Sequence, residues 1–236
     1  MKNKKSAFCL VIISVLILTS SCSKSQQADQ RNSDTDELYN YEVTEEPFEN
    51  MEIVNSYADY ITYDSEAELY EASEMVFIGM PTETFTDGEE LLYNFNAEII
   101  PDNSDDKIAY CFTVRNVKVL KMLKGDDSIK EIKVAEEAMK QTDLNGTVRI
   151  IGLPDNTCIT KKNVKYIYYV KKAAQPSMDF YLTRMDQGIV NIDGLDANSR
   201  SVVSEQRLNE VKTRFSTDFA KYDHRSEEHT SELQSP

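Results

Sequence analysis

Apolar residues alternate with polar ones along residues 108–125, and this alternation predicts the longest β-strand of the chain. The first half places four apolar side chains on one face at a period of two, namely Ile108, Tyr110, Phe112 and Val114. The second half continues the series at Val117 and Val119, which are out of phase by one residue. One extra residue near Arg115 and Asn116 would restore the phase. We therefore expect a β-bulge there, which would let the strand curl around a small barrel.

Further short apolar runs, separated by turn residues, predict additional strands at residues 75–79, 91–95, 129–134, 148–151, 164–170, 180–185 and 188–192. Many short strands with turns between them favour a closed or nearly closed antiparallel barrel. The pattern therefore predicts a mainly β fold.

Two helices are expected, one on each side of the strand series. Ser65-Glu-Ala-Glu68 is a capping box, which predicts a short helix over residues 65–73. A second helix is predicted over residues 201–221, because five apolar residues recur at helical spacing, namely Leu208, Val211, Phe215, Phe219 and Tyr222. We interpret this stripe as a face that packs on the core.

The N-terminal residues 1–21 have the form of a secretory signal. A basic start precedes an apolar run that is too short to span a membrane, and small residues follow it before Cys22. The sequence Leu18-Thr-Ser-Ser-Cys22 resembles the lipobox of bacterial lipoproteins, and this resemblance implies lipidation of Cys22. A diacylglyceryl cysteine is a stable two-chain anchor, so we expect attachment to the outer, extracytoplasmic face of the cell membrane. The alternative is an ordinary secretory signal with an incidental cysteine.

Charge separates a tether from a folded domain. The formal net charge is −15 at pH 7, and residues 22–64 carry many acidic residues against only Lys24 and Arg31. With almost no apolar periodicity, this segment is expected to be a disordered acidic tether. We place one domain at residues 65–224. A chain this acidic repels nucleic acid and anionic headgroups, so we expect no nucleic-acid partner and membrane contact through the anchor alone.

Two cysteines remain in that domain. Cys111 and Cys158 could form a disulfide outside the membrane, or they could be two buried thiols in neighbouring strands. Their spacing does not decide between these alternatives.

Three motifs resemble the netrin-like domain, which is also found in tissue inhibitors of metalloproteinases and in bacterial lipoproteins. They are Ser73-Glu-Met-Val-Phe-Ile-Gly79, Val117-Lys-Val-Leu-Lys-Met-Leu-Lys-Gly125 and Lys165-Tyr-Ile-Tyr-Tyr-Val170. The resemblance implies a small OB-type barrel with an N-terminal and a C-terminal helix packed alongside. The inhibitors of this family chelate a protease zinc through a free cysteine at the start of the domain. Cys22 does not match that position, so only the fold and a general binding role carry over.

The common catalytic groups are absent from this domain. Its first histidine is His224, and there is no glycine-rich phosphate loop, no Gly-x-Ser-x-Gly and no Cys-x-x-Cys. We expect no enzyme activity, no metal and no cofactor. A carboxylate-dependent hydrolase stays open as an alternative, because it would need only two acids facing each other across a cleft.

The sequence therefore predicts a lipid-anchored binding module with a protein or glycan ligand. Four tyrosines could offer a stacking surface to that ligand, namely Tyr166, Tyr168, Tyr169 and Tyr181. The alternative is that these tyrosines belong to the core and to an ordinary sheet face. A structural envelope lipoprotein without a discrete ligand is the competing function.

The closing residues 225–236 match the translation of a common short-read sequencing adapter, and we expect them to be an assembly artefact. Resequencing the locus should therefore replace codons 225–236 with a different end to the reading frame. Recovery of the same codons from genomic DNA would contradict this expectation.

Overall fold

The computed structural model describes residue 48 and residues 51–56, 61–93, 110–154, 159–174, 178–184 and 186–223. The predicted signal, Cys22, most of the tether, Cys158 and the terminal segment 225–236 lie outside these described residues. Contacts divide the chain into residues 1–40 and 41–236, and every described residue belongs to the second unit.

Strands outnumber helices among the described residues of this unit. They are β1 (Glu52–Ser56), β2 (Met75–Pro81), β3 (Glu89–Tyr93), β4 (Tyr110–Lys124), β5 (Glu131–Glu136), β6 (Met139–Thr142), β7 (Val148–Pro154), β8 (Tyr166–Lys172), β9 (Phe180–Leu182) and β10 (Ile189–Asn191). The helices are α1 (Glu66–Ala72), α2 (Ala197–Val202), α3 (Glu205–Arg214) and α4 (Ser216–Tyr222), with a 3-10 turn, η3, at Phe85–Asp87.

Five strands close into a barrel. Their order is β8-β2-β4-β5-β9, and β9 pairs again with β8 to complete the ring. Neighbours are antiparallel except for β5 and β9, which run parallel where Val134 faces Phe180. Because the ring is closed, each of these five strands pairs with a neighbour on both sides. The expected small OB-type barrel with flanking helices is confirmed.

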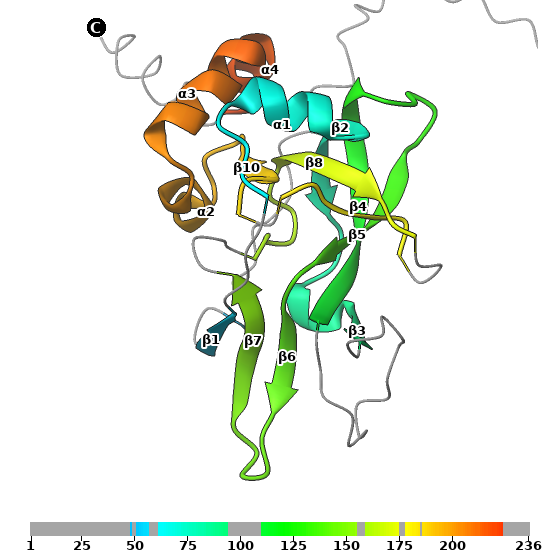
Figure 1. Cartoon of the computed structure of the whole chain (residues 1–236), viewed down its shortest axis with the longest axis vertical. Coiled ribbons are helices and arrows are strands. Elements are labelled where there is room, and N and C mark those ends of the chain that lie inside the picture. Colours follow the sequence, from blue (N-terminus) through cyan, green and yellow to red (C-terminus); the bar gives the residue numbers. More distant parts are fainter. Residues whose placement is uncertain are drawn as a thin grey trace, which may run out of the picture. The chain divides into compact units, whose positions relative to one another are not determined.

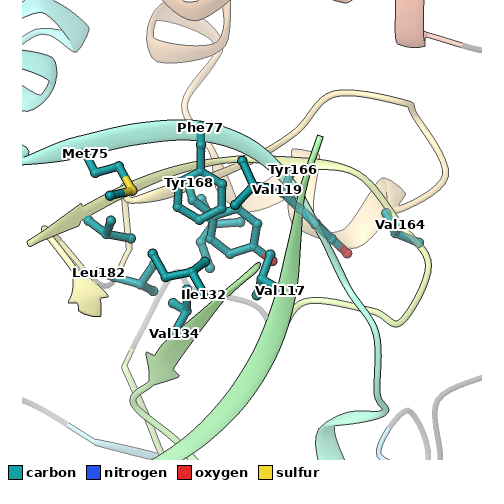
Figure 2. Packing of buried hydrophobic residues seen from close by; sticks show 12 residues of the cluster. Met75, Phe77, Val117, Val119, Ile132, Val134, Val164, Tyr166, Tyr168 and Leu182 are labelled. Atoms are coloured by element: carbon teal, nitrogen blue, oxygen red, sulfur yellow. The ribbon is translucent and has the colours of Figure 1, made fainter. Parts of the chain in front are cut away.

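The barrel interior is filled by side chains from all five strands (Figure 2). Phe77 of β2 and Tyr168 of β8 stack face to face, with ring centroids 5.1 Å apart and planes inclined by 9°. Val117 of β4 and Val134 of β5 pack beside them and are fully buried. Such apolar burial is the main favourable term in the stability of the domain.

A second, smaller sheet has the order β1-β7-β6, and Figure 1 shows β6 and β7 as a hairpin with β1 beside β7. β1 pairs in parallel with β7, and Phe48 just before it is buried against Phe85. The expected boundary of the tether at residue 64 is therefore corrected. The sequence signal for β1 is weak because Ile53 and Val54 remain partly exposed, so no buried apolar face marks the strand.

The helices pack against one another and against the barrel (Figure 1). Ser65 caps α1 as expected by accepting a bond from the Glu68 amide, whereas the Glu68 carboxylate accepts from Asp64 instead of closing the box on Ser65. The single helix expected over residues 201–221 is replaced by α2, α3 and α4. The break between α3 and α4 lies at Phe215, whose φ of −113° and ψ of 37° are not helical. Four members of the predicted stripe are buried, as expected of a packing face: Val211, Phe215, Phe219 and Tyr222.

The long strand β4 shows why the predicted bulge is misplaced. Pairing with β5 runs without interruption from Thr113 to Lys118, so no bulge lies at Arg115 and Asn116. The register shifts instead opposite β2, where Leu120 and Leu123 are skipped. The apparent change of phase has another cause. Val117 and Val119 lie on the inward face of β4. Three more buried side chains share that face and are polar or small, namely Cys111, Thr113 and Arg115.

Arg115 is buried in an ionic contact between strands. Its guanidinium pairs with the Glu136 carboxylate and donates to the Thr160 carbonyl at 2.8 Å. Thr160 in turn donates to Glu136 through its hydroxyl at 2.6 Å and through its amide at 3.2 Å. The Phe85 ring lies 5.7 Å from the guanidinium carbon. A buried ion pair of this kind depends on such additional bonds, because both charges have lost their water.

Removing one partner of this pair should destabilise the protein strongly. We expect Arg115→Met to lower the free energy of unfolding by about 3–5 kcal/mol, because Glu136 is left buried without its counter-charge. Urea unfolding followed by circular dichroism measures this change. Lys133→Met is the matched control, since Lys133 and Glu89 form an exposed pair at 3.7 Å, and it should change stability by less than about 1 kcal/mol. Equal losses in the two variants would contradict the role of Arg115.

Candidate functional site

The outer face of β4 carries apolar side chains that the barrel interior does not use. Because Val117 points inward, alternation along the strand turns Val114 and Phe112 outward. Their cross-strand partners lie on the same face: Leu91 of β3 opposite Phe112, and Ala135 of β5 opposite Val114. These residues form a second apolar cluster together with Tyr93, Met178, Ala173 and Tyr181. None of them belongs to a helix.

This cluster borders a groove of about 350 Å³, which we call the aromatic groove. It is lined by Tyr93, Tyr110, Phe112, Lys172, Ala174, Met178 and Tyr181. The rings of Tyr93 and Phe112 meet edge to face, with centroids 5.9 Å apart. Tyr93 is buried, whereas Tyr110 is 52% exposed, so the lining extends from the interior of the cluster to the surface.

Three parts of the barrel converge on the aromatic groove. Tyr93 lies in the connection between the first and second barrel strands, β2 and β4, and Phe112 lies on β4 itself. Ala174 and Met178 lie in the connection between the fourth and fifth strands, β8 and β9. In OB-type barrels, ligands bind over the second and third strands between these same two connections. The aromatic groove thus lies over the second strand and between these two connections, while the third strand, β5, contributes Ala135 to the cluster behind it.

The structure separates the four tyrosines that the sequence suggested as a ligand face. Tyr166, Tyr168 and Tyr169 are fully buried, and only Tyr181 reaches the aromatic groove. This corrects the expectation for the first three, which are core residues as the alternative proposed. The physical reason is that β8 is covered on both sides: Tyr168 faces the barrel interior, and Tyr169 lies under α1, where its hydroxyl donates to Glu66 at 3.0 Å.

Hydrogen bonds fix the buried hydroxyls of Tyr166 and Tyr169. The Tyr166 hydroxyl donates to Asp196 at 2.8 Å and accepts from the Lys161 amide at 2.8 Å. Burial, together with the negative charge of Glu66, raises the pKa of the Tyr169 hydroxyl far above its usual range. Tyr169 therefore stays protonated and serves as a donor in the core.

Sequence reasoning missed most residues that line the aromatic groove. The sequence places Tyr110 and Phe112 on one apolar face of a strand, and the expected bulge would continue that face through Val117 and Val119. The useful signal was the change of phase itself. A strand whose apolar series switches sides has one apolar stretch on each face.

The carboxylates offer little support for a hydrolase. A polar pocket of about 480 Å³ is lined in part by Asp64, Asp186 and Glu210. A general acid needs a raised pKa. The Glu66 amide and the Gln206 side chain instead lower the pKa of the Glu210 carboxyl by hydrogen bonding. Asp186 is paired with Arg184.

Within the described ranges, no three or more His, Cys, Asp or Glu side chains are grouped so that they could hold a metal ion. No helix in the part of the chain that the structure describes is sufficiently long and apolar to cross a membrane. A scan against protein-family models, a search of curated proteins and a search of solved structures each find no match to this chain.

Cys111 is the cysteine that the described residues contain. It lies against β7, with its sulfur 3.8 Å from the Ile151 carbonyl oxygen and Gly152 beside it. Gly152 has a φ of +81°, and a Cβ atom there would come within 2.2 Å of the sulfur, so glycine is required at this contact. Because Cys158 lies outside the described residues, both alternatives for the pair, a disulfide and two buried thiols, stay open.

The environment of Cys111 predicts its reactivity. Burial, assisted by the charges of Glu137 and Glu90, raises the pKa of the thiol to about 12. At pH 8, we expect the native protein to alkylate at Cys111 with iodoacetamide on the order of a thousand-fold more slowly than a free thiol. Mass spectrometry of the peptide that contains Cys111 measures this rate. Rapid native alkylation would contradict the raised pKa.

Unfolding in urea distinguishes the two cysteine alternatives. A free thiol should then react at the ordinary rate without reductant. A disulfide with Cys158 should block the reaction until reductant is added.

Proposed function

We propose that this protein is a lipid-anchored extracytoplasmic binding module whose ligand occupies the aromatic groove. The observation that carries the proposal is the position of the groove. Aromatic side chains gather over the second strand of a closed OB-type barrel, between the two connections that contribute to binding in this fold. An apolar hollow with a few polar groups is the usual form of a binding site.

The charge of the protein limits the class of ligand. The formal net charge is −15, and Lys172 is the only cationic residue among the described residues that line the groove. Nucleic-acid sites need several cationic groups to neutralise phosphates. A protein or glycan ligand therefore remains, as the sequence predicts.

The anchor is the second part of the proposal. The lipobox-like sequence before Cys22 supports attachment through a diacylglyceryl cysteine. Strong acidity keeps the rest of the chain away from anionic headgroups, so the barrel would be free to meet a ligand outside the membrane.

The structural alternative is a lipoprotein that fills space in the envelope and has no ligand. It does not explain why Tyr110 is held half-exposed beside buried Tyr93 and partly buried Phe112. A stacking platform of this kind is typical of surfaces that exclude water when a partner arrives.

Lipidation can be tested by metabolic labelling with an alkyne-bearing palmitate in cells that produce the full chain. We expect the protein to be labelled, and Cys22→Ala to remove the label. Cys111→Ala is the matched control and should keep it, because that thiol is buried in the barrel domain. A label that persists in Cys22→Ala would refute the anchor.

The groove can be tested in the same cells with a photoreactive phenylalanine analogue placed at Tyr110. We expect a specific adduct of defined mass from Tyr110, because this side chain is exposed at the rim of the groove. The same analogue at Leu144, which is fully exposed in the turn between β6 and β7, is the control for random collisions. Equal adducts from both positions, or none from a folded protein, would favour the structural alternative.

A further inference from the structure

The polar pocket that contains Asp64, Asp186 and Glu210 is a second candidate site, which we call the α3 pocket. It lies where the start of α3 meets the segment before α1 and the turn before β10. Its volume of about 480 Å³ is within the usual range for small-molecule sites. Among the described residues it shares no lining residue with the aromatic groove, so its ligand is a separate question from the proposed function.

Arg207 is the cationic residue among the described residues that line the α3 pocket. Although it is charged, it is only 6% exposed. Its Nη2 atom donates to the Tyr63 carbonyl at 2.7 Å and lies 3.5 Å from Oε1 of Gln187. Its Nη1 atom has no hydrogen-bond partner within the described residues. A buried guanidinium with an unused donor is unfavourable, and an anionic acceptor in the pocket would satisfy it.

The N-terminus of α3 adds to this preference for an anion. The helix follows its cap residue Ser204, whose hydroxyl accepts from the Arg207 amide at 3.2 Å. The first turn of a ten-residue helix carries partial positive charge and N–H groups without helical partners. Ser204 and Gln206 both line the pocket. The helix terminus and Arg207 therefore favour a carboxylate in the same pocket.

The carboxylates of the lining argue against a simple anion. Two of them are already engaged, because Glu210 accepts two hydrogen bonds and Asp186 is paired with Arg184. Asp64 differs. It is exposed, and its carboxylate forms no ion pair or hydrogen bond within the described residues. The α3 pocket thus combines one guanidinium donor and one carboxylate that are both available to a ligand.

These two groups come from neighbouring points of the lining. Arg207 is bonded to the carbonyl of Tyr63, and Tyr63 directly precedes Asp64 in the chain. Arg207 and Asp64 nevertheless form no ion pair with each other in the described structure. A ligand that carries a carboxylate and an ammonium group a few bonds apart complements this arrangement of charges. Free α-amino acids are ligands of this kind.

We propose that the α3 pocket binds a free α-amino acid. Arg207 and the first turn of α3 hold the carboxylate of the ligand, and Asp64 holds its ammonium group. An inorganic anion would place a like charge beside Asp64, and a simple amine would leave Nη1 of Arg207 without an acceptor. A zwitterion avoids both costs.

The test uses the full-length protein, purified in detergent, and a panel of the common L-amino acids. Thermal unfolding identifies the binders, because a ligand that binds only the folded state raises the Tm. Titration calorimetry then compares the tightest binder with its α-amide and its N-acetyl derivative, each of which removes one charge. We expect each derivative to bind at least about ten-fold more weakly than the free amino acid.

Protein variants locate the site. Asp64→Asn should weaken binding of the free amino acid at least about ten-fold, and it should not change binding of the N-acetyl derivative, which lacks the ammonium group. Arg207→Gln should remove measurable binding, and circular dichroism shows whether this variant is folded. Asp127→Asn is the matched control and should bind normally, because Asp127 is an exposed acid in the turn after β4 and does not line the pocket.

Each contrary result overturns the proposal. If no amino acid raises the Tm or gives a heat of binding, the α3 pocket is not an amino-acid site. Equal affinity for the α-amide would show that the carboxylate is not recognised, and equal affinity for the N-acetyl derivative would point to the C-terminus of a peptide as the ligand.

Binding that is unchanged in Asp64→Asn lies elsewhere on the protein and also overturns the proposal. If Arg207→Gln does not fold, Asp64→Asn and the two derivatives decide. The cellular adduct at Tyr110 tests the aromatic groove independently, so failure at the α3 pocket leaves the proposed function standing.

Discussion

The guanidinium of Arg115 is buried between two apolar clusters, the barrel core around Val117 and the cluster of the small sheet around Phe85. It binds Glu136 on the neighbouring strand and Thr160 just before β8. These contacts join the second and third barrel strands to the segment that begins the fourth. The arrangement is specific because both charges have lost their hydration on burial, and each needs the other to replace it.

The same contact determines what the other face of β4 can do. Since Arg115, Thr113 and Cys111 point inward, Phe112 and Val114 must point outward. The outward side chains then meet Tyr181 and Met178 and form the cluster behind the aromatic groove. The alternation of side chains along β4 therefore has two consequences. It places polar side chains inside this end of the barrel and apolar side chains outside it.

Much of the fold could be predicted from the sequence because most strands carry their own signal. Turn residues separated the apolar runs, and Ser65 indicated the start of α1. The errors have physical causes. A buried charge such as Arg115 is indistinguishable from a solvated one in a sequence pattern, so the sequence predicts a bulge where β4 instead carries a polar stretch of its inner face. For the tyrosines of β8 the sequence leaves both a ligand face and the core open, because nothing in it reveals that α1 covers Tyr169 while Tyr166 and Tyr168 face the barrel interior.

The candidate site was harder to predict because it is assembled across distant segments. Tyr93, Phe112 and Tyr181 come from three strands, and only the register of β3, β4, β5 and β9 brings them to one face. The covering of the barrel is also uneven. α1 lies over β8, where Glu66 accepts the Tyr169 bond, whereas no described helix residue joins the cluster around Phe112. A stable domain gains nothing by leaving Tyr110 half in water beside such a cluster. Among the described residues, no helix covers this face of β4, and the proposed ligand site rests on that feature.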